Sequence, residues 1–208
     1  MIILLQSTSF PFLRNPEKKY NININSGHRV NIYGASGSGK SCIIRAIVGL
    51  NNQFNGNIIL SDKRWSEITD EKWFQLRKDC FSIVFQQLEL FEEMTVVENI
   101  NLVSNLYPNI NSSQIDSISQ SLDLKQYFNT KVKYLSVGEK QRVAITRALI
   151  RPFTWLILDE SFSHLDKNNI QICIELIKSN LNENNAGLIL TSHSKNKMFE
   201  YNTYIPLD

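Results

Sequence analysis

The sequence predicts an α/β fold: a P-loop-type core with a mainly parallel sheet, an antiparallel β subdomain near the N-terminus and an inserted α-helical subdomain. Three observations support this prediction. A glycine-rich turn at 34–41 joins a short apolar strand to a helix. The apolar run 155–158 ends abruptly in two acids, as buried parallel strands often do. Between about 96 and 134, apolar residues recur at helical spacing, and Pro108 divides them into at least two helices.

Size and composition set limits on the molecule. The 208 residues suit one domain, 1–208, with the helical subdomain at approximately 88–140. A net charge of +2 gives no reason to expect a nucleic acid as partner. Three unclustered cysteines indicate reduced thiols rather than disulfides. No apolar run approaches the roughly 18 residues of a membrane span. We therefore expect a soluble chain without a membrane anchor of its own.

The N-terminal segment has a β-like but broken pattern. Residues 1–5 are apolar and lack the basic flank and cleavage site of a signal peptide, so we expect an edge strand there. Residues 20–24 alternate isoleucine or tyrosine with asparagine, which predicts a half-buried strand. Phe10 and Phe12 flank Pro11 in a polar segment. Packing in the core and stacking on a nucleotide base explain this pair equally well.

The turn at 34–41 has the spacing G-x-x-x-x-G-K-S of a phosphate-binding P-loop. Its glycines allow backbone angles and close approach that a side chain would block. Successive N–H groups and the following helix N-terminus then attract an anion. Lys40 would reach the β- and γ-phosphates, and the Ser41 hydroxyl would bind Mg²⁺. The residues predicted to hold the nucleotide here are Gly34, Ala35, Ser36, Gly37, Ser38, Gly39, Lys40, Ser41 and Cys42.

The middle of the chain supplies two further candidates. Thr69 is a plausible N-cap for a helix over 69–78, and the acids that follow it suit a first turn. Residues 81–85 predict a strand that delivers Gln86 to a loop. A loop glutamine is usually structural, so Gln86 has a catalytic meaning only if it faces the γ-phosphate.

A capped helix begins at Ser136. Glu139 lies three residues further on, which is the spacing of a capping box. The segment can therefore be an ordinary well-capped helix. With Ser136 and Gly138 at its start, it is also a candidate anion site.

The last third of the chain adds acids and a histidine. Asp159 and Glu160 follow a fully apolar strand, as in a Walker B element, and beside a P-loop they favour metal and water chemistry. Asp166 is a plausible cap for the next helix. A buried strand at 187–191 delivers His193, which taken alone is more often structural than catalytic. Residues 201–206 predict a final strand.

Five elements in this order resemble the ATP-binding subunit of ABC transporters, over nearly the whole chain. They are GASGSGKS at 34–41, Gln86 after an apolar strand, LSVGEKQR at 135–142, WLILDE at 155–160, and His193 after GLILTS. The LSGGQ-type element is the specific one, because other P-loop families share only the Walker pair. Residues 85–100 look most like small bacterial cassettes of the lipoprotein-release and macrolide-export kind.

The resemblance implies a role for each matching position. Gln86 would contact Mg²⁺ and the γ-phosphate region, and Asp159 would lie on the Mg²⁺ side. Glu160 would polarise the attacking water, and His193 would hold the γ-phosphate. Ser136 and Gly138 would cap the ATP of an opposing subunit, while residues 163–166 would form the D-loop. Phe12, with Phe10 as a weaker choice, would stack on adenine.

Three positions depart from the family pattern. Ser161 replaces the proline that follows the two acids, Val137 replaces the first glycine of LSGGQ, and Glu139 replaces its glutamine. Glu139 puts a negative charge near an anion site, which is mildly unfavourable. It also stands in a first helical turn, where acids are tolerated. None of the three changes removes a group that performs chemistry, so an active ATPase is expected.

The family further implies that two chains, as a homodimer or with a second cassette, close head to tail around two ATP molecules. Membrane-spanning permease subunits would be the partners, and the chain would lie peripherally on the cytoplasmic face of the inner membrane. ATP-driven closure would power transport. A non-transport role, in which the same cycle regulates a cell-envelope or cell-division complex, stays open as the alternative. DNA-repair ATPases are disfavoured because the chain has no sustained heptads.

Overall fold

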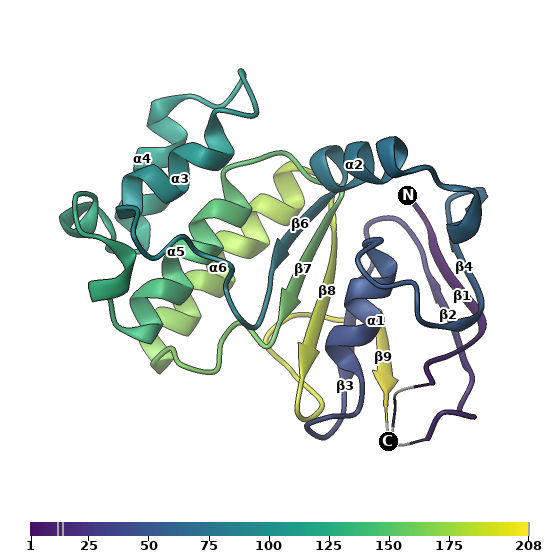
Figure 1. Cartoon of the computed structure of the whole chain (residues 1–208). Helices are drawn as coiled ribbons and strands as arrows, with labels where there is room; N and C mark the ends of the chain where they lie inside the picture. The colour runs from purple at the N-terminus through teal and green to yellow at the C-terminus, as the bar shows by residue number, and fades with distance from the viewer. Residues whose placement is uncertain (12, 14, 208) are drawn as a thin grey trace.

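The computed structural model describes residues 1–11, 13 and 15–207, and it contains two sheets (Figure 1). The first sheet has the order β2-β1-β4-β5, and its neighbouring strands are all antiparallel. The second has the order β6-β7-β8-β3-β9, and its strands are all parallel. The strands are β1 (Ile3–Ser9), β2 (Tyr20–Ile24), β3 (Arg29–Tyr33), β4 (Asn55–Leu60), β5 (Lys63–Arg64), β6 (Phe81–Val84), β7 (Trp155–Asp159), β8 (Gly187–Ser192) and β9 (Thr203–Pro206). The predicted fold class is confirmed.

Helices cover both faces of the parallel sheet. Figure 1 shows α1 on one face and α5 with α6 on the other, while α3 and α4 lie beyond α5. The helices are α1 (Lys40–Ile47), α2 (Asp70–Asp79), α3 (Val96–Ser104), α4 (Ser112–Ser121), α5 (Val137–Leu149) and α6 (Lys167–Glu183), with short 3₁₀ turns at Trp65–Glu67, Lys125–Tyr127 and Val132–Tyr134. Within the described residues, no helix is long and apolar enough to cross a membrane.

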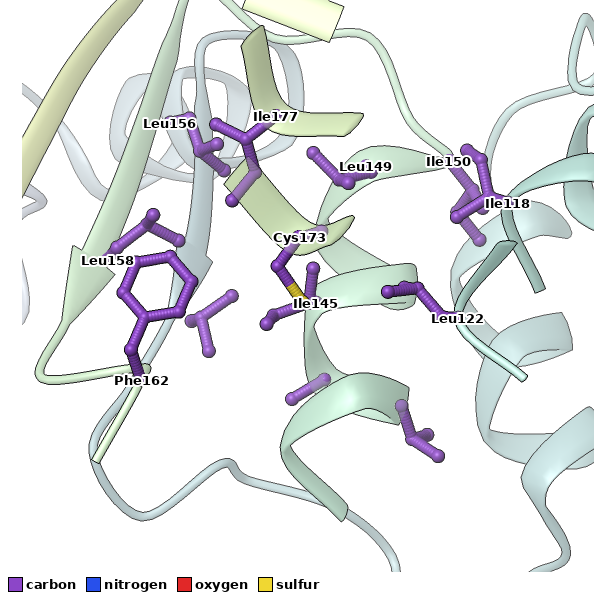
Figure 2. Packing of buried hydrophobic residues seen from close by; sticks show 14 of the residues in the cluster. Ile118, Leu122, Ile145, Leu149, Ile150, Leu156, Leu158, Phe162, Cys173 and Ile177 are labelled. Atoms are coloured by element: carbon purple, nitrogen blue, oxygen red, sulfur yellow. The ribbon is translucent and has the colours of Figure 1, made fainter. Parts of the chain in front are cut away.

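The interior strand β7 explains the continuous apolar run at 155–158. Leu156 and Leu158 pack against α5 and α6, as Figure 2 shows. Trp155 and Ile157 point the other way, into the core that contains α1. All five residues of β7 are buried. Because both faces of the strand are covered, the period-two alternation of a half-exposed strand is absent.

One strand prediction is wrong in its position. The N-terminal strand is not an edge strand, because β1 pairs with β2 on one side and with β4 on the other. Its residues Ile3 and Leu5 are buried in the core shared with α1. An apolar strand start is compatible with either position. The pairing with β4, about 50 residues further along the chain, decides between them and is not visible locally.

The predicted helix starts agree with the structure. Thr69, Ser136 and Asp166 are the N-caps of α2, α5 and α6, and each side chain accepts a hydrogen bond from the first helical turn. Pro108 lies between α3 and α4, as predicted. Both of these helices bury apolar side chains in the same core as α5 and the parallel sheet. The helical segment is thus packed firmly onto the element that begins at Ser136.

Candidate functional site

The P-loop connects β3 to α1 through two glycines with left-handed backbone angles. Gly37 has φ +76° and Gly39 has φ +93°, a region that side chains other than glycine's rarely adopt. A Cβ atom on Gly39 would also lie 2.3 Å from Leu13 Cδ2. Gly39 is the N-cap of α1 and has no side chain to cap it. The first N–H groups of α1 are therefore available to an anion, as the sequence predicts.

Lys40 lies at the centre of this loop with its charge enclosed. The residue is only 4% exposed. Its Nζ donates to the carbonyl oxygens of Gly34, at 2.8 Å, and Ala35, at 3.0 Å. It also forms an ion pair with Oε1 of Glu160 at 3.1 Å. The charge of Lys40, the predicted phosphate ligand, is thus neutralised by the carboxylate that follows β7.

Glu160 connects four separate parts of the chain. Its Oε1 faces Lys40, while its Oε2 lies 3.2 Å from Nε2 of His193 and 3.4 Å from Nε2 of Gln86. The backbone of Glu160 has φ +51°, which is uncommon for a residue with a side chain. Its N–H donates to Oγ1 of Thr191 at 3.1 Å. Three residues predicted as catalytic from separate motifs therefore meet one carboxylate.

Thr191 is a site residue that the sequence reasoning missed. Its Oγ1 donates to Oδ1 of Asp159 at 2.6 Å and accepts from the N–H of Glu160. Thr191 and Asp159 are each 2% exposed. One buried hydroxyl thus fixes both acids at the end of β7. Its only signal in the sequence is a polar residue at the end of an otherwise apolar strand.

A cavity of about 290 Å³ lies between the P-loop and Glu160. Residues from the predicted nucleotide and catalytic sets line it together with Leu13: Ser36, Gly37, Gly39, Lys40, Ser41, Cys42, Gln86 and Glu160. Burial raises the pKa of the Cys42 thiol, so this cysteine is not an activated nucleophile. A second cavity, of about 240 Å³, adjoins the P-loop at Ala35, Ser36 and Ser38. The volume and the donors suit a nucleotide.

The aromatic predicted to stack on adenine is not located by the structure. Phe12 lies outside the described residues. Phe10 is fully buried and packs against the rings of Tyr20 and Phe54, at 6.1 and 6.3 Å between ring centroids. A base could not reach its face, so the packing explanation holds for Phe10. The second cavity is lined mainly by apolar surface from Leu13, Tyr20 and Leu207.

Ser136 and Gly138 lie apart from the P-loop of the same chain. Neither lines the two cavities, and α5 lies on the sheet face opposite α1 (Figure 1). The carboxylate of Glu139 accepts from the N–H and the hydroxyl of Ser136, each at 2.7 Å. Burial works against this charge, but hydrogen bonds from Tyr127 and Ser136 outweigh it and lower the pKa of Glu139. Glu139, which stands where the family pattern has glutamine, is therefore engaged in the helix cap with Ser136.

The start of α5 is joined to the segment after β7. Gln141 accepts from the N–H of His164 at 3.2 Å and lies 3.4 Å from Oγ of Ser163. A Cβ atom on Gly138 would lie 3.0 Å from the carbonyl oxygen of His164. Only glycine permits this close approach without a shift of the backbone. The element at 135–142 and the segment at 163–166 are thus in direct contact through Gly138 and Gln141.

A parallel α/β core, a P-loop with an enclosed lysine and two acids at the end of the adjoining strand define a P-loop nucleoside triphosphatase. The family model described as ABC transporter matches residues 18–163. The chain therefore belongs to the ABC transporter ATP-binding family and is an ATP-binding, ATP-hydrolysing cassette.

Relatives with several transport roles are similar to the chain. A lipoprotein-releasing system ATP-binding protein LolD of Buchnera aphidicola is 34% identical, over 84% of this chain and 78% of that protein. The thiamine import ATP-binding protein ThiQ of Haemophilus influenzae is 32% identical, over 86% and 82%. Importers and a lipoprotein-release protein thus match at comparable identity.

Solved structures agree with the fold. The dimeric post-hydrolysis state of the ATP-binding cassette MJ0796, bound to ADP and Pi, has a TM-score of 0.80 at 27% identity. This match covers 93% of the present chain and 88% of that one. A bacterial Atm1-family ABC exporter with ATP bound has a TM-score of 0.82 at 25% identity, and the match covers 37% of that longer chain.

Proposed function

We propose that this chain hydrolyses ATP as half of a closed dimer and so powers a transporter through membrane-spanning partner subunits. The observation that supports this most strongly is the convergence of Lys40, Gln86 and His193 on the single carboxylate of Glu160. These residues come from four separate segments, and each matches a position of the family pattern. Phosphoryl transfer to water requires charged and polar groups placed together around the γ-phosphate and the attacking water, and this arrangement supplies them next to the P-loop.

Lys40 and the P-loop N–H groups would hold the phosphates, with the residues from Gly34 to Cys42 as the cradle. Bound phosphate would replace Glu160 as the partner of Lys40, since both anions compete for one buried ammonium group. Glu160 would then be free to orient and polarise the attacking water. His193, with its side chain 64% exposed, has room to turn toward the γ-phosphate.

The oxygen donors present fit Mg²⁺. This ion prefers one or two protein oxygens together with water and substrate phosphates. Ser41 supplies a hydroxyl in the cavity, and Asp159 supplies a buried carboxylate whose Oδ1 is held by Thr191. Gln86 would add an amide oxygen. We propose Ser41, Gln86 and Asp159 as the residues that hold the ion, whose charge would neutralise the phosphates.

The ATP-binding site would be completed by Ser136 and Gly138 of a second copy of the chain. Within one chain these residues begin a helix on the sheet face opposite α1, so they are poorly placed for their own P-loop. The dimeric neighbour with ADP and Pi supports a paired arrangement. We further propose that residues 88–140 act as a helical subdomain of a single domain, and that the chain attaches peripherally to the cytoplasmic face of the membrane.

A mixing experiment tests completion of the site between chains. Lys40→Ala removes the phosphate ligand, and Ser136→Arg blocks the capping element. Each variant alone should be inactive as a homodimer. In a mixed dimer, the P-loop of the second variant faces the intact Ser136 of the first. An equimolar mixture should therefore recover up to about a quarter of wild-type turnover, because half of the dimers are mixed and each has one intact site.

The outcomes of this experiment separate the possibilities. If both variants are inactive and their mixture stays inactive although it forms mixed dimers, completion between chains is wrong. A mixture of Lys40→Ala with a second P-loop variant, Ser41→Ala, provides the control and should recover nothing. Identification of the membrane protein that copurifies with the chain then tests the transport role. A partner with no substrate pathway would favour regulation of an envelope or division complex.

A further inference from the structure

Asn31 is a fully buried asparagine in the middle of β3, between two apolar residues that pack in the core. Its exposed fraction is 0%. Burial of an amide costs free energy unless its hydrogen bonds are made, so the identity of its partners is informative. All of the partners that the structure gives it lie in the segment that contains His193.

The side chain of Asn31 contacts this segment on both sides of the histidine. Its Nδ2 donates to the carbonyl oxygen of Leu190 at 3.1 Å and to Oγ of Ser192 at 2.8 Å. Its Oδ1 accepts from the N–H of Asn196 at 2.9 Å. The backbone of His193 is therefore held in place by the contacts of Asn31 with Ser192, just before the histidine, and with Asn196, three residues after it.

Two further hydrogen bonds extend this support into the loop. Oγ of Ser192 donates to the carbonyl oxygen of Ser194 at 2.7 Å. The side-chain oxygen of Asn196 accepts from the N–H of Met198 and from the hydroxyl of Tyr201. The turn that presents His193 is thus tied to Asn31 directly and through Ser192.

The pairing of the two strands does not need these side-chain bonds. β3 and β8 are already joined by a regular parallel ladder from Arg29 to Tyr33. At its end, the N–H of Gly34 donates to the carbonyl oxygen of Ser192 at 3.2 Å. An apolar residue at position 31 would pack in the same core without an amide to satisfy. The contribution specific to Asn31 is therefore to the turn beyond the ladder.

We propose that Asn31 is a positioning residue for His193. Its hydrogen bonds fix the position of the histidine relative to β3, the strand that leads into the P-loop. This inference rests on the proposed role of His193 at the γ-phosphate. The imidazole is 64% exposed and contacts Glu160 at 3.2 Å, while the backbone around it is fixed by hydrogen bonds to Asn31. Catalysis depends on such placement, since a misplacement of about 1 Å can cost roughly 100-fold in rate.

The test compares the full-length variants Asn31→Ala, His193→Ala and the double variant, with ATP and Mg²⁺. Asn31→Ala should lower kcat about 10- to 100-fold, and it should change the KM for ATP and the affinity for a fluorescent ATP analogue less than twofold. In the His193→Ala background, Asn31→Ala should lower kcat no further, because its target is already absent. Asn180→Ala removes a buried asparagine from α6, which bonds within its own helix, and should leave kcat unchanged.

Four results would overturn the inference. One is a normal kcat for Asn31→Ala when His193→Ala is impaired, which leaves the proposed function intact. Another is a full additional loss in the double variant, which would show that Asn31 acts independently of the histidine. If His193→Ala has normal turnover, the role of His193 and this inference fall together. Should Asn31→Ala not fold, Ser192→Ala, which breaks only the link through Ser192, should lower kcat severalfold, and a normal kcat would refute the proposal.

Discussion

The substitution Glu160→Gln removes one negative charge. It should lower the rate of ATP hydrolysis and raise the affinity for nucleotide. Glutamine keeps the size of the side chain and an acceptor for Lys40, so the P-loop should remain folded. It can no longer accept a proton from water, so hydrolysis should slow. It also no longer neutralises the buried ammonium group at 3.1 Å, so phosphate should bind more readily. Tighter binding with slower turnover is the signature of this geometry.

The size of each effect follows from the contacts. Removal of a general base typically costs about 10²- to 10⁴-fold in rate. In the wild type, the contact of Glu160 with Lys40 joins two opposite charges, whereas in Glu160→Gln only Lys40 is charged. Hydrogen bonds to charged groups are worth about 1.5–3 kcal/mol, and the pair with two charges belongs at the strong end of this range. The competing contact to Lys40 should therefore weaken by about 1 kcal/mol, which is roughly fivefold in nucleotide affinity. Both partners are nearly enclosed, with 4% and 11% exposure, so solvent screens little of this difference.

Turnover, the affinity for a fluorescent ATP analogue and the dimer population on size exclusion with ATP and Mg²⁺ measure these effects. We expect a dimer that persists with ATP, together with slow hydrolysis. Glu175→Gln, the same chemical change on the exposed side of α6, should match the wild type in all three. Normal hydrolysis by Glu160→Gln, combined with a monomer in the presence of ATP, would show that Glu160 has been assigned the wrong role.

Two further substitutions test the support of the site. Thr191→Val keeps the shape of the side chain but removes the hydroxyl that holds Asp159 and Glu160. Turnover should fall about tenfold, and the free energy of unfolding should fall by about 1–3 kcal/mol. Normal turnover would mean that the two acids keep their positions without this hydroxyl. Gly187→Ala would put a Cβ atom 2.2 Å from the ring of Trp155. Chemical denaturation should show a loss of about 1–3 kcal/mol from this overpacking, and an unchanged midpoint would contradict the close packing of Gly187 against the ring of Trp155.

Much of the fold could be predicted because local sequence and tertiary packing demand the same residues. The strand β7 is buried on both faces, so its sequence is apolar throughout. The caps Ser136 and Asp166 are predictable because each accepts from its own first helical turn. The place of β1 inside its sheet was not predictable, since its second neighbour, β4, begins at Asn55.

The residues of the candidate site also fall into two groups, those that are recognisable from the sequence and those that are not. The motifs at 34–41 and 155–160 can be recognised from their spacing, because each is a single short segment whose residues act together. Thr191 and Asn31 have no such signature. Their importance depends on partners 32 and 165 residues away, respectively, such as Asp159 and Asn196.

The amino-acid sequence alone predicts the chemical groups of the site: a nucleotide cradle, two acids, a glutamine, a histidine and the cap element of an ATP-binding cassette. Tertiary structure decided how these groups act on one another. It brings Lys40, Gln86 and His193 to the carboxylate of Glu160, and it keeps Ser136 away from the P-loop of its own chain. The physical reason is that parallel strands present their carboxyl ends at one edge of the sheet, whatever their separation in the chain.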